Sequence, residues 1–131
     1  MSKTLLAISS FSLFVLPCLA SGQEPSPSLM WNAAGTDDYV NLGAKLSRVG
    51  DLNADGYNDI LSMSPNANVF NFSTAGKIVA LSGIDGSVLW DYAGWQDNQN
   101  FGSYVTRPGD INGDGIDDFI VAEPEANYLN L

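Results

Sequence analysis

The sequence DLNADGYND at residues 51–59 places oxygen-bearing side chains at the first, third, fifth and ninth positions of a short segment. A second copy, DINGDGIDD, follows at residues 110–118. Glycine occupies the sixth position of both, where a side chain would obstruct a sharp turn. Ca2+ takes about six to eight oxygen ligands, and a tight loop with ligands at alternating positions supplies them. Both segments are therefore predicted to be calcium-binding loops.

Each loop is expected to offer four side chains and one backbone carbonyl to the ion. The seventh position contributes its carbonyl oxygen, so its side chain is free to vary between the two copies. The eighth position, Asn58 or Asp117, is expected to point away from the ion into solvent. The expected ligands are Asp51, Asn53, Asp55, the Tyr57 carbonyl and Asp59 in the first loop, and Asp110, Asn112, Asp114, the Ile116 carbonyl and Asp118 in the second.

Two other interpretations of these loops compete with a calcium site between strands. An EF-hand needs a bidentate acid at position 12 and a helix on each side. Position 12 is Ser62 or Val121 here, inside a strand-like run, which argues against an EF-hand. The second alternative is an Asp/Asn/Gly-rich turn without metal, and two copies with matched ligand positions argue against that.

The charge balance points to a cation rather than to nucleic acid. The formal net charge is −10 and there is no histidine. Phosphate binding needs clustered Lys and Arg, whereas the basic residues beyond Lys3 are scattered: Lys45, Arg48, Lys77 and Arg107. Three carboxylates in one loop repel each other unless a cation lies between them. Nucleic acid is therefore not an expected partner.

Residues 1–22 are predicted to form a signal peptide. Lys3 precedes an apolar run over residues 5–16, and small residues follow, with cleavage after Ala20 or Gly22. The apolar run is too short for a membrane span, although an N-terminal anchor helix stays an alternative, as does a lipid anchor on Cys18. We expect a secreted protein, extracellular or periplasmic, with a linker at residues 23–28 and no stable membrane span in the mature chain.

A repeat longer than the loops organises the chain. Residues 28–68 align without a gap with residues 87–127, with 17 identities in 41 positions. Such a fixed period is typical of solenoids and propellers. Short strand-like runs fill each period, and no mature stretch has a helical period. The expected strands are 29–31, 43–49, 60–64, 77–81, 88–90, 101–106 and 119–122, the last being apolar enough to be covered on both faces.

These residues resemble the FG-GAP repeat, a family that includes the β-propeller of integrin α subunits. Phe101-Gly102 before the second loop and Ala122-Glu123-Pro124 after it carry the resemblance. Leu42-Gly43 and Met63-Ser64-Pro65 form a weaker first copy. The resemblance covers residues 29–127. It implies four-stranded blades whose calcium loop joins the first two strands, with Ca2+ held by the ligands given above.

The expected fold is therefore all-β, a partial β-propeller with fewer than two complete blades. Within the repeat region at 29–131, we expect a lone strand at 29–32, one blade at 42–92 and an incomplete blade at 101–131. Propellers have about four to eight blades, so the sequence is expected to be a fragment or a truncated product. Its open sheet edges would then need further blades or another chain.

Several residues outside the loops have more than one possible role. Trp31 and Trp90 end apolar strands, which favours core packing over a sugar-stacking surface. Trp95 lies in a polar stretch, where it would be a loop anchor or a ligand contact. Arg48 and Arg107 recur at equal spacing, which favours a structural role near the loops. Asn71-Phe72-Ser73 fits a glycosylation acceptor.

These observations predict a binding or adhesion module with an unknown protein or carbohydrate ligand. No catalytic constellation is present, since there is no histidine and Cys18 is the only cysteine; the segment is expected not to be an enzyme. One alternative is the β-propeller portion of a secreted enzyme, such as a polysaccharide lyase or a phospholipase. A further alternative is a truncated remnant that never closes.

Overall fold

The computed structural model describes residues 12–15, 31–34 and 41–125. The expected linker at 23–28, most of the signal peptide with Cys18, and residues 126–131 lie outside the described residues. The described part is all-β, as predicted, and contains no helix. Its strands are β1 (Ser12–Val15), β2 (Trp31–Ala34), β3 (Lys45–Arg48), β4 (Ile60–Ser64), β5 (Lys77–Leu81), β6 (Val88–Ala93), β7 (Tyr104–Gly109) and β8 (Asp118–Ala122).

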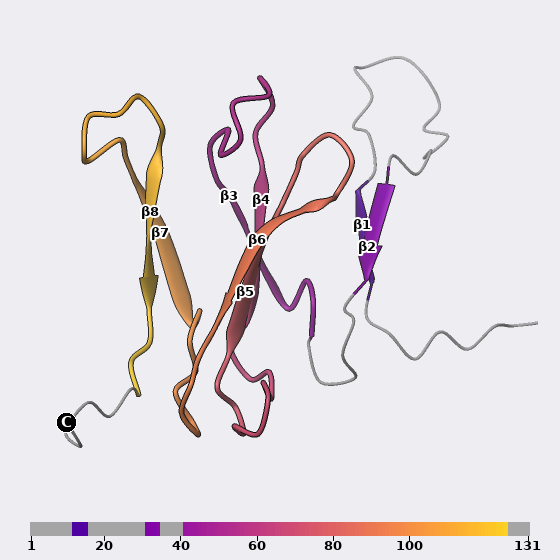
Figure 1. Ribbon diagram of the computed structural model, residues 1–131, viewed down its shortest axis with the longest axis vertical. Helices are drawn as coiled ribbons and strands as arrows, with labels where there is room; N and C mark the ends of the chain where they lie inside the picture. The colour runs from indigo at the N-terminus through magenta and orange to yellow at the C-terminus, as the bar shows by residue number, and fades with distance from the viewer. Residues whose placement is uncertain (1–11, 16–30, 35–40, 126–131) are drawn as a thin grey trace, which may run out of the picture.

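The strands form three antiparallel sheets that stand side by side (Figure 1). The central sheet has four strands in the order β3-β4-β5-β6, so each strand pairs with its neighbour in sequence. The strand pairs β1-β2 and β7-β8 form the two flanking sheets. In β3-β4 the register pairs Arg48 with Ile60, and in β7-β8 it pairs Gly109 with Asp118. Both metal-loop candidates therefore sit at hairpin ends.

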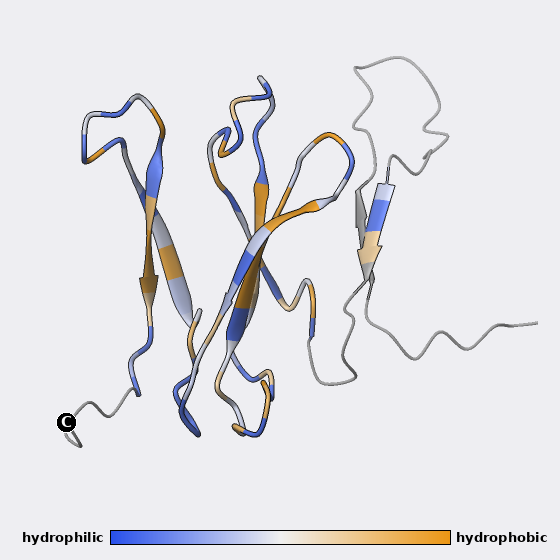
Figure 2. Ribbon diagram, in the orientation of Figure 1, coloured by the Kyte–Doolittle hydropathy of each residue, from blue (hydrophilic) through white to orange (hydrophobic). Residues whose placement is uncertain are grey.

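The central strands β4 and β5 are apolar enough to be covered on both faces. One face carries Leu61 and Met63 of β4 with Ile78 and Ala80 of β5, which belong to the main hydrophobic core. The opposite face carries Val79 and Leu81, which pack with Leu42 and Ala33. Residues on alternating faces of a strand thus contact different neighbouring sheets. Figure 2 shows strongly hydrophobic stretches in β4 and β8, and further hydrophobic residues at several loop tips.

The main core joins the central sheet to the β7-β8 sheet. Phe119 and Val121 of β8 and Val105 of β7 pack against it. Trp90 of β6 stacks on Phe119, with ring centroids 5.5 Å apart and an interplanar angle of 8°. At the opposite edge of the central sheet, the Lys45 ammonium donates to the Ser103 carbonyl at 2.7 Å. The two sheets are therefore held by side chains far apart in sequence.

The two residues by which the first repeat departs from the FG-GAP pattern are both buried. Leu42 is 7% exposed and joins the second core. The Ser64 hydroxyl donates to the Asn41 carbonyl at 2.7 Å, and the Ser62 hydroxyl accepts from the Gly43 amide at 2.8 Å. These serines anchor the segment before β3 to the back of β4, because a buried hydroxyl needs a partner.

One expectation needs correction. β8 was expected to be covered on both faces, yet Ile120 is 51% exposed, because no sheet of the described residues packs over its outer face. Part of the apolar run of the expected signal peptide forms β1, which pairs with β2 through Val15 opposite Trp31 and Ser12 opposite Ala34; the signal peptide itself stays a prediction. A strand edge with free backbone groups takes up an available apolar segment.

Candidate metal-binding loops

The two loops occupy equivalent places in two different sheets. The first loop, residues 51–59, joins β3 to β4, and the second loop, residues 110–118, joins β7 to β8; both lie at the same end of the molecule (Figure 1). The base of the first loop is closed by the Asp59 amide donating to the Gly50 carbonyl at 3.0 Å. The base of the second is the equivalent pair, Gly109 with Asp118. Loop positions below run from 1 to 9 in each copy.

In the first loop the side-chain oxygens gather around backbone amides. Position 1 accepts from the amides of positions 5 and 6 at 3.0 and 2.7 Å, and position 3 accepts from the amide of position 5 at 3.1 Å. The position 3 amide group donates to the position 5 carboxylate at 2.8 Å, which also accepts from the position 7 amide at 2.9 Å. Position 9 accepts from the amide of position 2 at 2.7 Å. The acceptors are Asp51, Asn53, Asp55 and Asp59.

The second loop repeats every one of these hydrogen bonds. The amides of positions 5 and 6 donate to position 1 at 3.2 and 2.8 Å, and the position 5 amide donates to position 3 at 2.9 Å. The position 3 amide group donates to the position 5 carboxylate at 3.0 Å, and the position 7 backbone amide donates to the same carboxylate at 2.8 Å. The position 2 amide donates to the position 9 carboxylate at 2.8 Å. One bond is added, from the Gly113 amide to Asp110 at 2.6 Å. The acceptors are Asp110, Asn112, Asp114 and Asp118.

Two backbone positions in each loop have the left-handed conformation. Position 6 is Gly56 with φ 89° or Gly115 with φ 88°, which accounts for the glycine that the sequence places there. Position 4 is also left-handed, as Ala54 with φ 59° and Gly113 with φ 81°. The sequence pattern did not single out position 4, because one copy carries alanine there.

The acid at position 9 differs most between the loops. Asp59 is fully buried, and its second oxygen accepts from the Gly83 amide in the β5-β6 loop at 3.0 Å. Gly83 permits this approach, since a Cβ there would lie 2.0 Å from the Asn58 carbonyl oxygen. Asp118 is half-buried and has only the contact with Ile111 among the described residues. Sequence reasoning missed Gly83, because nothing in local spacing links it to position 9.

The predicted ligand residues are thus brought together in part. In each loop, the side chains of positions 1 and 3 both accept from the position 5 backbone amide. The position 9 carboxylate accepts from the position 2 backbone amide. Within the described residues, no three His, Cys, Asp or Glu side chains form a group suited to a metal, so the three acids of each loop, at positions 1, 5 and 9, are not gathered around one point. The side chains at position 7, Tyr57 and Ile116, are 60% and 42% exposed, as their carbonyl role would allow.

Backbone amides stabilise the ionised form of the Asp110 carboxyl in the second loop. The Gly115 amide first, and then the Gly113 amide, hold the pKa of the Asp110 carboxyl below its ordinary 3.8. This side chain is therefore ionised at neutral pH. An ionised carboxylate is the form that binds a cation.

The expectation that the position 8 side chains of both loops are solvated is wrong for the second loop. Asn58 is exposed, as expected, but Asp117 is one-third exposed and forms an ion pair with Arg107. This pair lies against the base of the first loop, where a Cβ on Gly50 would be 3.1 Å from the Asp117 Cβ. Arg107 therefore has the structural role predicted for it, whereas Arg48 is exposed and makes no ion pair with a described residue.

The tryptophans divide between core and surface. Trp31 is 7% exposed, packs against Gly86 and donates from Nε1 to the Gly83 carbonyl at 3.1 Å, which confirms the core assignment. Trp90 is partly buried by its stacking on Phe119. Trp95 is 44% exposed and meets Tyr92 edge-on at 6.3 Å. It remains compatible with both a loop anchor and a ligand contact.

Comparison with known proteins identifies a similar chain. The chain is similar to an integrin alpha chain. Integrin alpha-PS3 of Drosophila melanogaster is 31% identical over 105 residues, which cover 72% of this chain and 9% of that protein. The chain therefore spans about a tenth of the length of this relative. No known family profile matches the sequence. In the part of the chain that is described, no helix has the length and apolar character to cross a membrane.

Proposed function

We propose that the chain is a calcium-binding FG-GAP repeat segment of a secreted β-propeller, which serves adhesion or ligand binding. The observation that carries the proposal is the set of hydrogen bonds that the two loops share. Two segments 59 residues apart share loop conformation, acid placement and position in a hairpin. An asparagine oxygen could accept the same backbone amides without a charge, so the acids retained at positions 1, 5 and 9 of both loops favour a bound ion.

The donor set of each loop fits Ca2+. It consists of oxygens alone, from three carboxylates, one amide and the backbone carbonyl of position 7, and hard cations prefer such ligands. The first site would use Asp51, Asn53, Asp55, the Tyr57 carbonyl and Asp59. The second would use Asp110, Asn112, Asp114, the Ile116 carbonyl and Asp118. When bound, the ion supplies two positive charges to a loop with three negative ones.

The surrounding charges favour the same proposal. The ion pairs among the described residues are Lys77 with Asp91 and Arg107 with Asp117, and neither involves an acid proposed as a ligand. The loop carboxylates therefore lack a protein cation within that part of the chain. Repulsion within each loop weakens once a cation is bound.

The arrangement of the sheets supports a propeller. Under this proposal the β3-β6 sheet is one complete blade and β7-β8 is the first half of the next. β2 would be the outer strand of a preceding blade, because Trp31 aligns with Trp90 of β6 in the repeat. Further blades or another chain would cover the outer face of β8, where Ile120 is exposed.

Adhesion or ligand binding, with an extracellular protein or carbohydrate as partner, is the activity most consistent with similarity to an integrin alpha chain. Secretion through residues 1–22 would expose the loops to millimolar calcium. We propose no catalytic role for this segment, since the sequence has no histidine and its one cysteine lies within that leader.

Thermal unfolding with and without calcium tests the proposal. Extracellular sites bind at about 0.1–1 mM, and tenfold excess adds about 1.4 kcal/mol per site. The melting temperature should rise from EDTA to millimolar Ca2+, and equal magnesium should give a smaller rise. Asp114→Asn should remove part of the rise, whereas Asp85→Asn, an equal charge change outside the loops, should leave it intact. Equal melting in EDTA and in calcium would contradict the proposal.

A further inference from the structure

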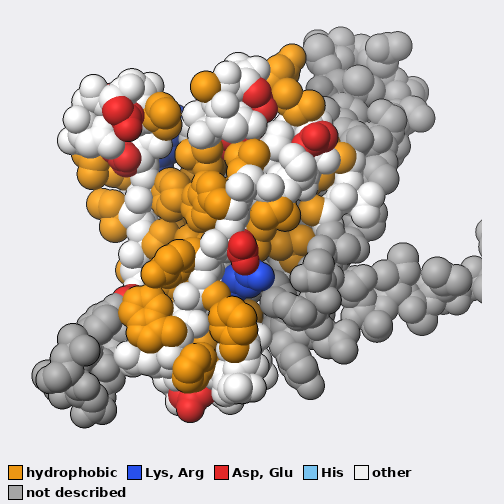
Figure 3. Space-filling model, in the orientation of Figure 1, with side chains coloured by type: hydrophobic (Ala, Val, Ile, Leu, Met, Phe, Trp, Pro, Cys, Tyr) orange, Lys and Arg blue, Asp and Glu red, His pale blue; other side chains and the backbone are white. Residues whose placement is uncertain are grey.

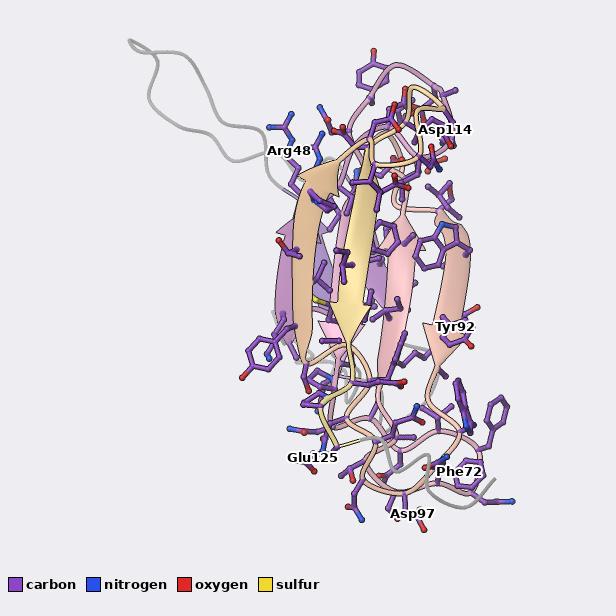
Figure 4. All side chains as sticks on the ribbon, turned by 90° about the vertical axis from the view of Figure 1, so that its left-hand side faces the viewer. Arg48, Phe72, Tyr92, Asp97, Asp114 and Glu125 are labelled. Carbon is purple, nitrogen blue, oxygen red and sulfur yellow. The ribbon has the colours of Figure 1, made fainter. Side chains whose placement is uncertain are left out.

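A tight turn in the β4-β5 loop presents an unusual pair of residues to solvent. Val69 and Phe72 exchange two backbone hydrogen bonds of 3.0 and 2.9 Å, which leaves Phe70 and Asn71 at the tip. Phe70 is 90% exposed and Asn71 is exposed. The turn lies at the end of the molecule opposite the metal-loop candidates, as the positions of Phe72 and Asp114 show in Figure 4.

The base of this turn is firmly held. Val69 is buried and packs with Ala67 and Ala75 in a small core of its own. The Ser73 amide donates to the Asp97 carboxylate at 2.7 Å, and the Thr74 amide donates to Asn68 at 2.8 Å. The tip therefore projects from an ordered base, and its exposure is a property of the fold.

The tip carries the acceptor pattern for N-linked glycosylation. Asn71-Phe72-Ser73 is the single Asn-x-Ser/Thr sequence in the chain. Such acceptors occur in surface loops of secreted proteins, where a bulky sugar fits without disturbing the core. Asn71 and Ser73 are both exposed, and Ser73 uses its backbone rather than its hydroxyl to hold Asp97.

Phe70 has a backbone conformation that bulky residues rarely adopt. Its φ is 55°, which is rare for a bulky residue and is taken at turn tips by glycine or asparagine. The same end of the molecule exposes other hydrophobic side chains (Figure 3), including Phe72 at 36% and Trp95 at 44%. A covering group attached at the tip would remove the Phe70 ring from water.

We propose that Asn71 is a glycosylation site and that the first sugar lies against Phe70. In the transfer, the Asn71 Nδ2 forms a bond to the anomeric carbon of an oligosaccharide carried on a lipid pyrophosphate. The bond from that carbon to the pyrophosphate oxygen breaks, the lipid pyrophosphate leaves, and one amide proton passes to a base of the transferase. The inference rests on the proposed secretion, because the donor and the transferase occur in secretory compartments.

Expression in cultured insect cells tests the modification, with two leaders used in parallel. One chain keeps residues 1–22, and the other carries an unrelated secretory leader ahead of residue 23. The chain with the unrelated leader should appear in the medium with one glycan on Asn71, removable by peptide N-glycosidase. Asn71→Gln and Ser73→Ala should abolish the glycan. Asn66→Gln, an exposed asparagine in the same loop outside the acceptor pattern, should keep it.

The outcomes separate this inference from the proposed secretion. Secreted wild-type chain with unmodified Asn71 would overturn the inference. A glycan that appears only with the unrelated leader would support the inference and show that residues 1–22 do not direct secretion.

The contact with Phe70 has its own measurement. The glycosylated chain should melt at a higher temperature than the same chain after enzymatic deglycosylation, and Phe70→Ala, which creates no new acceptor pattern, should reduce that difference. An unchanged difference in Phe70→Ala would overturn the contact.

Discussion

The first and second loops have the same internal hydrogen bonds but lie in sheets of different size. In the four-stranded central sheet, Asp59 is fully buried and reaches across to Gly83 of the neighbouring hairpin. In the two-stranded β7-β8 sheet, the equivalent Asp118 has only its contact within the loop among the described residues. The comparison separates what the nine-residue pattern determines from what the complete sheet adds. The pattern determines the loop conformation. Pairing with β5 brings the Gly83 amide to the Asp59 carboxylate, and this hydrogen bond links the two hairpins.

The largest expected difference between the loops is at position 9. Asp59→Ala leaves the partly buried amides of Leu52 and Gly83 without an acceptor, and a donor left unpaired away from water costs about 1–3 kcal/mol. We expect a loss of about 3 kcal/mol in the free energy of unfolding, against about 1 kcal/mol or less for Asp118→Ala, whose donor is exposed. Urea unfolding in EDTA measures both without a contribution from calcium. Equal losses would show that the Gly83 contact contributes nothing.

Position 4 should respond in opposite directions in the two loops. Gly113→Ala places a Cβ on a left-handed residue with no atom within 4 Å, so only backbone conformation changes, at a cost of about 1 kcal/mol. Ala54→Gly relieves the same conformation and should gain about 0.5 kcal/mol, because the more flexible unfolded chain offsets part of the relief. Denaturation midpoints test both. A stabilising Gly113→Ala would contradict the left-handed geometry.

The smallest expected effect concerns position 8. Asp117→Asn makes the second loop resemble the first and removes the ion pair with Arg107. Both partners are one-third exposed, so the expected loss is about 0.5 kcal/mol, and it should shrink at high salt. Arg48→Gln, which removes the first repeat's counterpart of Arg107, should leave unfolding unchanged. A salt-independent loss in Asp117→Asn would mean that packing against Gly50 matters more than charge.

Much of the fold was predictable because the information is local. The apolar runs around β4, β5 and β8 predict strands, and Asp85-Gly86 predicts the hairpin between β5 and β6, where Gly86 has φ 73°. Position 6 of each loop demands a left-handed glycine, and both copies have one.

The features that were not predictable depend on distant residues. The bond from Gly83 to Asp59, the stacking of Trp90 on Phe119 and the pairing of β1 with β2 join segments whose approach is fixed by sheet packing. The exposed face of Ile120 could not be inferred from its apolar neighbours, because composition does not reveal whether a neighbouring sheet is present.

The central claim is that each loop binds one calcium ion. Equilibrium dialysis against radioactive calcium at millimolar concentration counts bound ions directly. The account predicts two ions per wild-type chain and one in each of the variants Asp55→Ala and Asp114→Ala, which remove the central acid from one loop at a time. An equal calcium concentration on both sides of the dialysis membrane, with the folded wild-type chain on one side, would contradict calcium binding by the loops.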